Sequence, residues 1–433
     1  MAASQPATKE TKGQPAHGRK GWPSQVFAFN PAMLHWQRGV MVLDIMLVPL
    51  VVFLAIGHEE YLLSALFGVL FAGLADPGGS YGSRASRVAV FALIGAALTA
   101  LGFGIGGDAW GWLVLAAFAV TLLAGLAVMF GVHRFVTALL LNIWFIVALG
   151  TAFSFHQFNL THPHAQITSY TWAQVLAWAG GAALWIAVTF TAWLILGRHD
   201  RPQPVAEIPG DTSRHELTRP VIMFAVIRAV VIAGTTALAF GLNLSHGLWL
   251  PIAAIIAMKP DLVQTTLVAV QRLAGTLIGA TAAALLLLIP ANEHGQQLVS
   301  ITHGLEVVAL VLIMHAVAVI FWNYTFFAAA VSAAVLILMD VQQPTDYATE
   351  GYRVLWTLCG AAIALAVLFL GSLLAKRTAK APPRQLAGVP AQRSVVGEGI
   401  APDLTPSWGR QSAHRDPRWC CQHRAAKQRE AQQ

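Results

Sequence analysis

Long apolar runs recur along the chain and are separated by short polar breaks. Six runs lie in the first half, near 38–57, 61–75, 85–105, 110–131, 134–153 and 173–197. Six more lie in the second half, near 219–242, 247–259, 265–290, 301–320, 322–340 and 352–375. A helix of about 20 apolar residues crosses the hydrocarbon core of a bilayer. The pattern therefore predicts an all-α integral membrane protein with about 12 transmembrane helices.

The composition supports this prediction. The 433 residues are 56% hydrophobic and only 11% charged, so much of the apolar surface must face lipid. The net charge of +7 comes from basic residues in loops and tails, where anionic lipid headgroups account for them. The bilayer is therefore the expected partner, and nucleic-acid binding is not expected.

Polar segments frame the two sets of runs. Residues 1–37 predict a disordered basic arm, 198–218 a Pro-rich linker, and 376–433 a disordered basic tail. With all three in the cytoplasm, Arg353 alone among the 27 Lys and Arg residues falls in an external loop. This asymmetry predicts a multi-pass protein with both termini cytoplasmic. The membrane we expect is a bacterial-type inner membrane.

The two halves also resemble each other. "LAIG" at 54–57 matches "LAFG" at 238–241, and the segment from Arg87 to Gly95 matches that from Arg272 to Gly279. The offset is about 184 residues. Because each unit would hold an even number of crossings, we predict parallel six-helix repeats over 38–197 and 219–375, fused as a pseudo-dimer.

Two runs are too short to cross a bilayer. The run at 247–259 stops at Lys259-Pro260-Asp261, and the run at 61–75 stops at Asp76-Pro77. These are corresponding places in the two halves, where interrupted segments indicate a transporter's binding site. An ordinary cytoplasmic turn, with the lysine reaching lipid headgroups, is the alternative.

Charged residues near these breaks are the candidate site. The predicted substrate-binding side chains are Arg84, Arg87, Arg228, Lys259, Asp261 and Arg272. The offset maps Asp44, which lies inside an apolar run, onto Arg228. Since an isolated charge facing lipid is costly, the two could form an ion pair that is either static or part of transport.

Other chemistry is sparse. Glu306 and His315 share one run but not one helical face, so each alone could carry protons or simply pack. The sequence holds no phosphate-binding G-x-x-x-x-G-K-[ST] motif and no hydrolase motif, so we expect neither an enzyme nor a bound cofactor. We also expect no metal site.

Residues 247–286 carry a more specific pattern: W-x-P, an aliphatic run, Pro-Asp, and R-x-x-G-T-x-x-G. Its positions are Trp249, Pro251, Pro260, Asp261, Arg272, Gly275, Thr276 and Gly279. This pattern resembles the core of the fusaric acid resistance (FUSC) family, which includes bacterial aromatic carboxylic acid efflux proteins. The resemblance implies export or conduction of organic anions, with Arg84, Arg87, Lys259 and Arg272 attracting the carboxylate.

The sequence leaves several functions open. A proton-coupled exporter of aromatic carboxylic acids, working by alternating access, is the first interpretation. An organic-anion channel, a major-facilitator-type transporter and an envelope accessory protein without transport activity are the alternatives. Association with further copies of the chain, or with an envelope efflux partner, also stays open.

Overall fold

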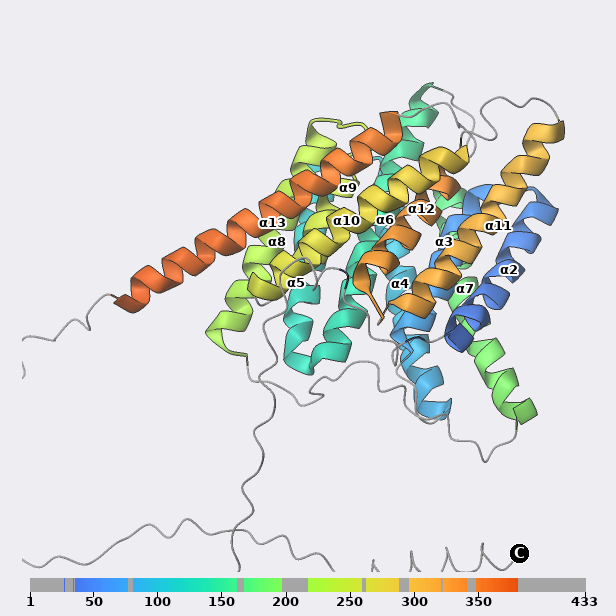
Figure 1. Cartoon of the computed structure of the whole chain (residues 1–433), viewed down its shortest axis with the longest axis horizontal. Helices are drawn as coiled ribbons and strands as arrows, with labels where there is room; N and C mark the ends of the chain where they lie inside the picture. Colours follow the sequence, from blue (N-terminus) through green and yellow to red (C-terminus); the bar gives the residue numbers. More distant parts are fainter. Residues whose placement is uncertain are drawn as a thin grey trace, which may run out of the picture. The chain divides into compact units, whose positions relative to one another are not determined.

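The computed structural model describes residues 27, 34, 36–76, 81–161, 167–196, 217–258, 262–287, 296–320, 322–340 and 348–380. Within these ranges the regular structure is entirely helical (Figure 1). With the numbering of Figure 1, the α-helices are α2 (Trp36–Ile56), α3 (Leu62–Ala75), α4 (Tyr81–Ile105), α5 (Trp110–Leu126), α6 (Val132–Thr161), α7 (Ile167–Leu196), α8 (Arg219–Gly241), α9 (Trp249–Ala257), α10 (Leu262–Leu287), α11 (Gln296–Val319), α12 (Tyr324–Asp340) and α13 (Ala348–Lys380). Two 3₁₀ turns, η2 (Glu59–Tyr61) and η3 (Ala127–Phe130), complete the described elements.

Eight of the described helices are long and apolar enough to cross a membrane: α2, α4, α5 with η3, α6, α7, α8, α10 and α13. The other four have shorter apolar stretches. At 1.5 Å per residue, α3 spans about 21 Å and α9 about 14 Å, against a hydrocarbon core of about 30 Å. Twelve crossings therefore remain a prediction, whereas the two shortened segments are confirmed.

Several helices extend beyond their apolar runs. Helix α6 continues to Thr161 and α7 begins at Ile167, where hydropathy alone ended the segment at 153 and began the next at 173. The added turns are polar, so hydropathy does not detect them although they remain helical. The predicted arm, linker and tail lie almost wholly outside the described residues.

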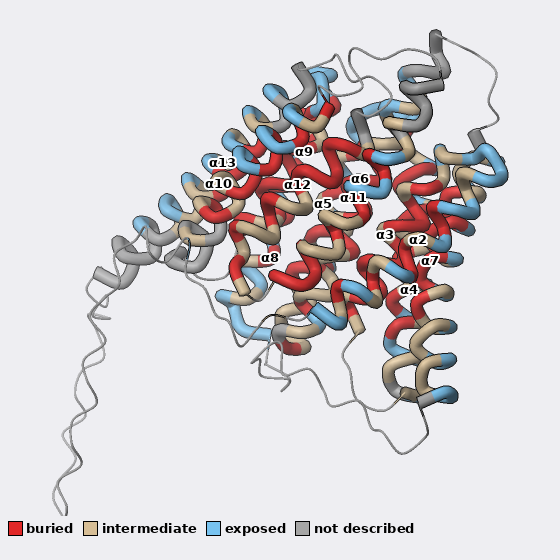
Figure 2. The backbone as a smooth tube through the Cα atoms, turned by 45° about the vertical axis from the view of Figure 1, so that its right-hand side comes forward, coloured by how far each residue is buried: buried red, intermediate tan, exposed pale blue. Residues whose placement is uncertain are grey.

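The two shortest α-helices are also the most enclosed. Eleven of the 14 residues of α3 and eight of the nine residues of α9 are buried. Figure 2 shows this buried backbone in red, and exposed positions along the longer helices in pale blue. In a membrane protein a helix that is apolar all round can face lipid or the protein interior, and burial places α3 and α9 in the interior. The fold thus surrounds both shortened segments with protein.

Glycines allow the closest helix contacts. Helix α10 packs on α12, and a methyl group added to Gly275 would lie 2.5 Å from the carbonyl oxygen of Thr325. Helix α4 packs on α6 through Gly102, which lies against Ala148. Small residues at such contacts are typical of membrane helices, where packing rather than a hydrophobic force drives association.

Among the described helices, three pairs join the first half of the chain to the second: α6 with α9, and two pairs that share a pattern. Helix α5 packs on α8, with Gly125 against Ala225, and α2 packs on α11, with Gly39 against Ala318. In each case the fourth helix of one half meets the first helix of the other half. The two contacts are therefore reciprocal.

Candidate functional site

The candidate site consists of the helix ends formed by α3 and α9. After α3 the backbone of Asp76 is extended, with ψ of 114°, and after α9 that of Met258 is extended, with ψ of 104°. Pro77 explains the end of α3, since the residue before a proline disfavours a continuing helix, and in the sequence Pro260 follows the last residue of α9 by three positions. The last four carbonyl groups of an α-helix have no partner within it. Both ends therefore present acceptors to side chains or ligands.

An arginine from the preceding helix reaches each of these ends. Arg38 Nη2, on α2, donates a hydrogen bond of 2.6 Å to the carbonyl oxygen of Gly73 in α3. Arg228 Nη2, on α8, donates one of 3.1 Å to the carbonyl oxygen of Ile255 in α9. Both acceptors are third from the end of their helix. A cation at this position also interacts favourably with the negative end of the helix dipole.

Sequence reasoning missed Arg38, because it lies at the first position of an apolar run and away from the two breaks in the sequence. The 184-residue offset does not align it with Arg228. Its place on the helix directly before a shortened segment is the signal that would have identified it.

Arg228 is the most unusual side chain of the site, because it is fully buried, with 0% exposure. Its guanidinium carbon lies 5.2 Å from the ring centroid of Phe135, a cation–π contact. Its Nε and Nη1 atoms are buried and have no hydrogen-bond partner. A cation with two unsatisfied nitrogen atoms in the interior can accept an anionic ligand.

The predicted ion pair between Asp44 and Arg228 is wrong. Asp44 lies on the exposed face of α2, whereas Arg228 turns into the interior and bonds to a backbone carbonyl. The repeat aligns these positions along the sequence. The two helices nevertheless bury different faces, so the aligned side chains point into different surroundings.

Further buried polar atoms without partners lie on α6 and α8. Asn142 is fully buried and accepts a hydrogen bond from Thr121 Oγ1 of α5, but its Nδ2 has no partner. Thr236 is fully buried, and its Oγ1 has no partner. We call Arg228, Asn142 and Thr236 the α6/α8 seam. Its free polar atoms can bind water or a polar ligand.

The two helices of the seam run in the same direction. Phe135 of α6 contacts Arg228 of α8, and further along, Phe153 contacts Phe240 with ring centroids 5.0 Å apart. The unpartnered amide lies seven residues beyond Phe135, and the unpartnered hydroxyl eight residues beyond Arg228. These steps correspond to about 10–12 Å along the helices. The unsatisfied groups are thus spread along the seam beyond the guanidinium.

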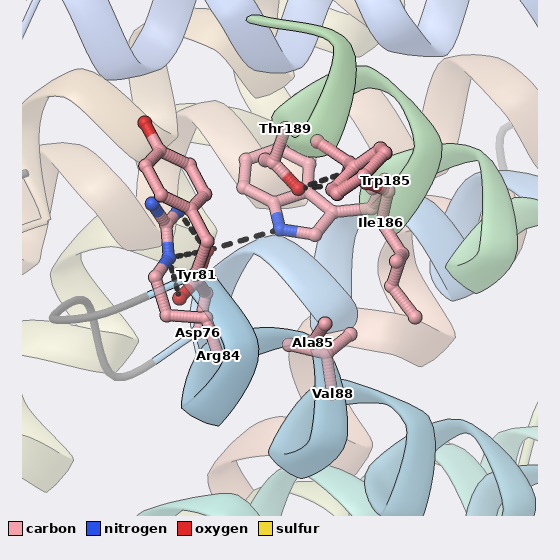
Figure 3. A pocket seen from close by; sticks show the side chains of 9 residues that line it. Asp76, Tyr81, Arg84, Ala85, Val88, Trp185, Ile186 and Thr189 are labelled. Atoms are coloured by element: carbon pink, nitrogen blue, oxygen red, sulfur yellow. Dashed lines mark hydrogen bonds and ion pairs between the residues drawn. The ribbon is translucent and has the colours of Figure 1, made fainter. Parts of the chain in front are cut away.

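At the first break the charges compensate each other (Figure 3). Arg84 Nε donates a 2.9 Å hydrogen bond to Asp76 Oδ1, and its Nη2 forms an ion pair with Oδ2. Trp185 Nε1 donates to the same Oδ2 at 3.2 Å. Both charged side chains are largely buried, at 14% and 5% exposure. Arg84 is therefore bound by Asp76 rather than free to attract a substrate carboxylate.

The structure places the other predicted cations differently. Arg87 is exposed on α4. Arg272, on α10, is half-buried, and its buried Nε has no hydrogen-bond partner. Lys259 and Asp261 lie outside the described residues. Arg272 therefore remains a candidate ligand near the second break, together with Arg228.

Glu306 and His315, the two candidate residues on α11, have separate surroundings. Glu306 is buried, and its Oε2 lies 3.3 Å from His303 Nδ1. His315 Nδ1 lies 2.8 Å from the carbonyl oxygen of Val311, and its ring meets Trp36 edge-on. In the described part of the chain, no three His, Cys, Asp or Glu side chains are arranged to hold a metal ion.

Comparison with known proteins adds one decisive match. Residues 230–367 match the fusaric acid resistance protein-like family. The matched FUSC region begins within α8, ends within α13, and contains the 247–286 pattern, so the resemblance is confirmed over the second half of the chain. No curated protein and no solved structure matches the chain.

The FUSC match and the eight candidate spans together establish a multi-pass membrane protein. They suggest a role in transport rather than catalysis. Arg272 and Glu306 lie inside the matched region, and Arg228 lies two residues before it.

Proposed function

We propose that the protein transports organic anions across a bacterial-type inner membrane, with aromatic carboxylates as the substrate class. The observation that carries the proposal is Arg228, a fully buried cation with two nitrogen atoms that lack partners. An isolated charge inside a membrane protein is costly and is usually retained for function. A substrate carboxylate would offset this cost by bonding to the free nitrogen atoms.

The surroundings of Arg228 favour an aromatic acid. The ring of Phe135 lies against the guanidinium. Two apolar residues nearby in the chain or by contact are fully buried: Ile232, one turn further along α8, and Ile255, whose carbonyl oxygen accepts a hydrogen bond from Arg228. Ligand sites typically combine apolar walls with a few placed polar groups. A carboxylate on an aromatic ring meets both requirements, and Arg272 from α10 would be the second cation.

We further propose that the two halves are parallel repeats that move against each other. The reciprocal contacts α5 with α8 and α2 with α11 support this, since a two-fold axis relates such contacts. The second and sixth helices of each half also meet at a glycine. Gly181 of α7 lies against Ala65 of α3, and Gly360 of α13 against Leu250 of α9. Both shortened helices would then face the shared axis, with access alternating between sides.

A channel is the second candidate, and the α6/α8 seam favours it. Polar atoms without partners beyond Arg228 would line a hydrated path for an anion in a single open conformation. A channel predicts unitary anion currents when the protein is placed in a planar bilayer. A transporter predicts vesicle flux without such currents.

Reconstitution of the full chain in liposomes tests the proposal. Phthalate is a suitable probe, because its two carboxylates keep it from crossing lipid unaided. We expect saturable phthalate exchange that Arg228→Met strongly weakens and that Arg87→Met, the exposed control, leaves unchanged. Flux equal to that of empty liposomes would overturn the transport function, and an unaffected Arg228→Met variant would overturn the site.

A further inference from the structure

The second half contains one buried carboxylate that anion binding does not use. Glu306 is 4% exposed. The other largely buried acidic side chain among the described residues is that of Asp76, which Arg84 binds. Glu306 lies on α11, which packs on α2 of the first half and on α12 of its own half. A buried carboxylate is costly in its charged form and much less so when protonated.

Its hydrogen-bond partner connects it to the surface. His303, one turn earlier on α11, places Nδ1 at 3.3 Å from Glu306 Oε2 and is itself 43% exposed. An imidazole can accept a proton on one ring nitrogen while it releases another proton from the second nitrogen. The pair therefore forms a two-step route from the surface to a buried acid.

The other charges around Glu306 are few. From the turn η2, Glu59 is near enough to act on Glu306 electrostatically. From α2 the ionisable groups are Arg38, which bonds to the end of α3, and Asp44, which is exposed. Among the described side chains of α12, one tyrosine is ionisable. A neighbouring carboxylate favours proton uptake by the pair.

The position of the pair matters because α2 and α11 belong to different halves. Gly39 and Ala318 bring the two helices into close contact further along. If the halves move against each other, this contact opens and closes. An opened contact hydrates Glu306 and favours its charged form, whereas a closed contact favours its protonated form.

We propose that Glu306, with His303 as its link to the surface, is the proton-binding site that couples a proton gradient to anion movement. The inference rests on the proposed transport of organic anions and identifies the coupling ion and its site. When the contact between α2 and α11 closes, the carboxylate holds one proton. When the contact opens on the other side, it releases that proton.

The experiment compares two kinds of phthalate flux in liposomes that contain the full chain. Exchange at equal pH needs no net proton movement, whereas accumulation driven by an imposed pH difference does. One proton per phthalate dianion leaves one net charge to cross the membrane, so the membrane potential is held at zero with a potassium ionophore and equal potassium on both sides. Under this condition a difference of two pH units supports about a hundredfold accumulation. We expect Glu306→Gln to retain exchange and to lose the accumulation.

His303→Gln removes the link but keeps the acid. We expect it to reach the same final accumulation several-fold more slowly, and a normal rate would overturn the role of His303. Glu60→Gln is the matched control. Glu60 pairs with His58 at 3.0 Å, but that pair is exposed, at 44% and 55%. This control should accumulate phthalate like the unaltered protein.

The remaining outcomes separate the two proposals. Full accumulation by Glu306→Gln would overturn the proton site and leave anion transport intact. Loss of exchange as well as accumulation would show that Glu306 serves folding or substrate binding, which also overturns the coupling role. Absence of exchange in the unaltered protein would instead refute the proposed transport itself.

Discussion

Replacing Arg228 by methionine tests whether this arginine binds the substrate or only stabilises the fold. Methionine keeps an unbranched stem of similar reach but removes the charge and all donors. The substitution leaves the cation–π partner Phe135 and the carbonyl of Ile255 without the guanidinium. It also removes two buried nitrogen atoms that have no partner.

The effects on stability nearly cancel. Loss of the charged hydrogen bond costs about 1.5–3 kcal/mol, and loss of the cation–π contact costs about 0.5–2 kcal/mol. Against this, removal of an uncompensated charge from the membrane interior stabilises the folded state by about 2.5–3.5 kcal/mol. We therefore expect the free energy of unfolding of Arg228→Met to change by no more than about 2.5 kcal/mol.

The effect on ligand binding does not cancel. A carboxylate loses at least one charge-assisted hydrogen bond, which is about 1.5–3 kcal/mol or roughly 10- to 150-fold in affinity. The assay is the concentration dependence of phthalate exchange, together with thermal unfolding of the same sample in detergent. Unchanged affinity would refute the site. A large loss of stability with unchanged affinity would show that Arg228 only holds α9 in place.

Three further substitutions test the architecture around the site. Arg38→Met should free the carbonyl of Gly73 and destabilise the end of α3 by about 1–3 kcal/mol, seen as faster amide hydrogen exchange confined to that helix end; uniform exchange would contradict this. Asp76→Asn should destabilise the protein because Arg84 loses its counter-ion, and a double-mutant cycle with Arg84→Met should give a coupling energy of about 0.5–3 kcal/mol; additive effects would contradict the pairing. Gly275→Leu should lower the unfolding temperature, since overpacking costs about 1–3 kcal/mol or more, whereas Gly304→Leu, on an open surface, should not. Equal effects at both glycines would contradict the close contact of α10 and α12.

Hydropathy and helix breakers predicted most of the architecture. The prolines after α3 and α9 placed both breaks within a residue or two, because proline acts locally on the backbone. Predictions that depend only on neighbouring residues in the sequence, such as where a helix ends, therefore agreed with the structure. Predictions about which side chains meet did not, because they depend on the face that each helix buries.

Asp44 shows this difference. Its neighbours Ile45 and Met46 are buried, at 2% and 0%, while Asp44 itself is exposed. A uniformly apolar helix carries no pattern that marks its buried face, so the sequence could not orient α2. The same ambiguity concealed the role of Arg38.

Two contacts between residues close in the sequence could have been predicted from their spacing but were not. His303 and Glu306 are three residues apart on one helix, a spacing that places side chains side by side. Asp76 and Arg84 are eight residues apart, at the end of α3 and the start of α4, and Pro77-Gly78-Gly79 lies between them in the sequence, a composition that favours turns. Both pairs follow from spacing alone once the helices are assigned.

Photoaffinity labelling with 4-benzoylbenzoate, an aromatic carboxylate that reacts with nearby C–H bonds, tests the central claim most directly. The account predicts labelled residues on α6, α8 or α9 around Arg228, protection by excess phthalate, and loss of this label in Arg228→Met. Labelling confined to exposed helix faces, unchanged by phthalate or by the substitution, would contradict the claim that the buried arginine binds the anion.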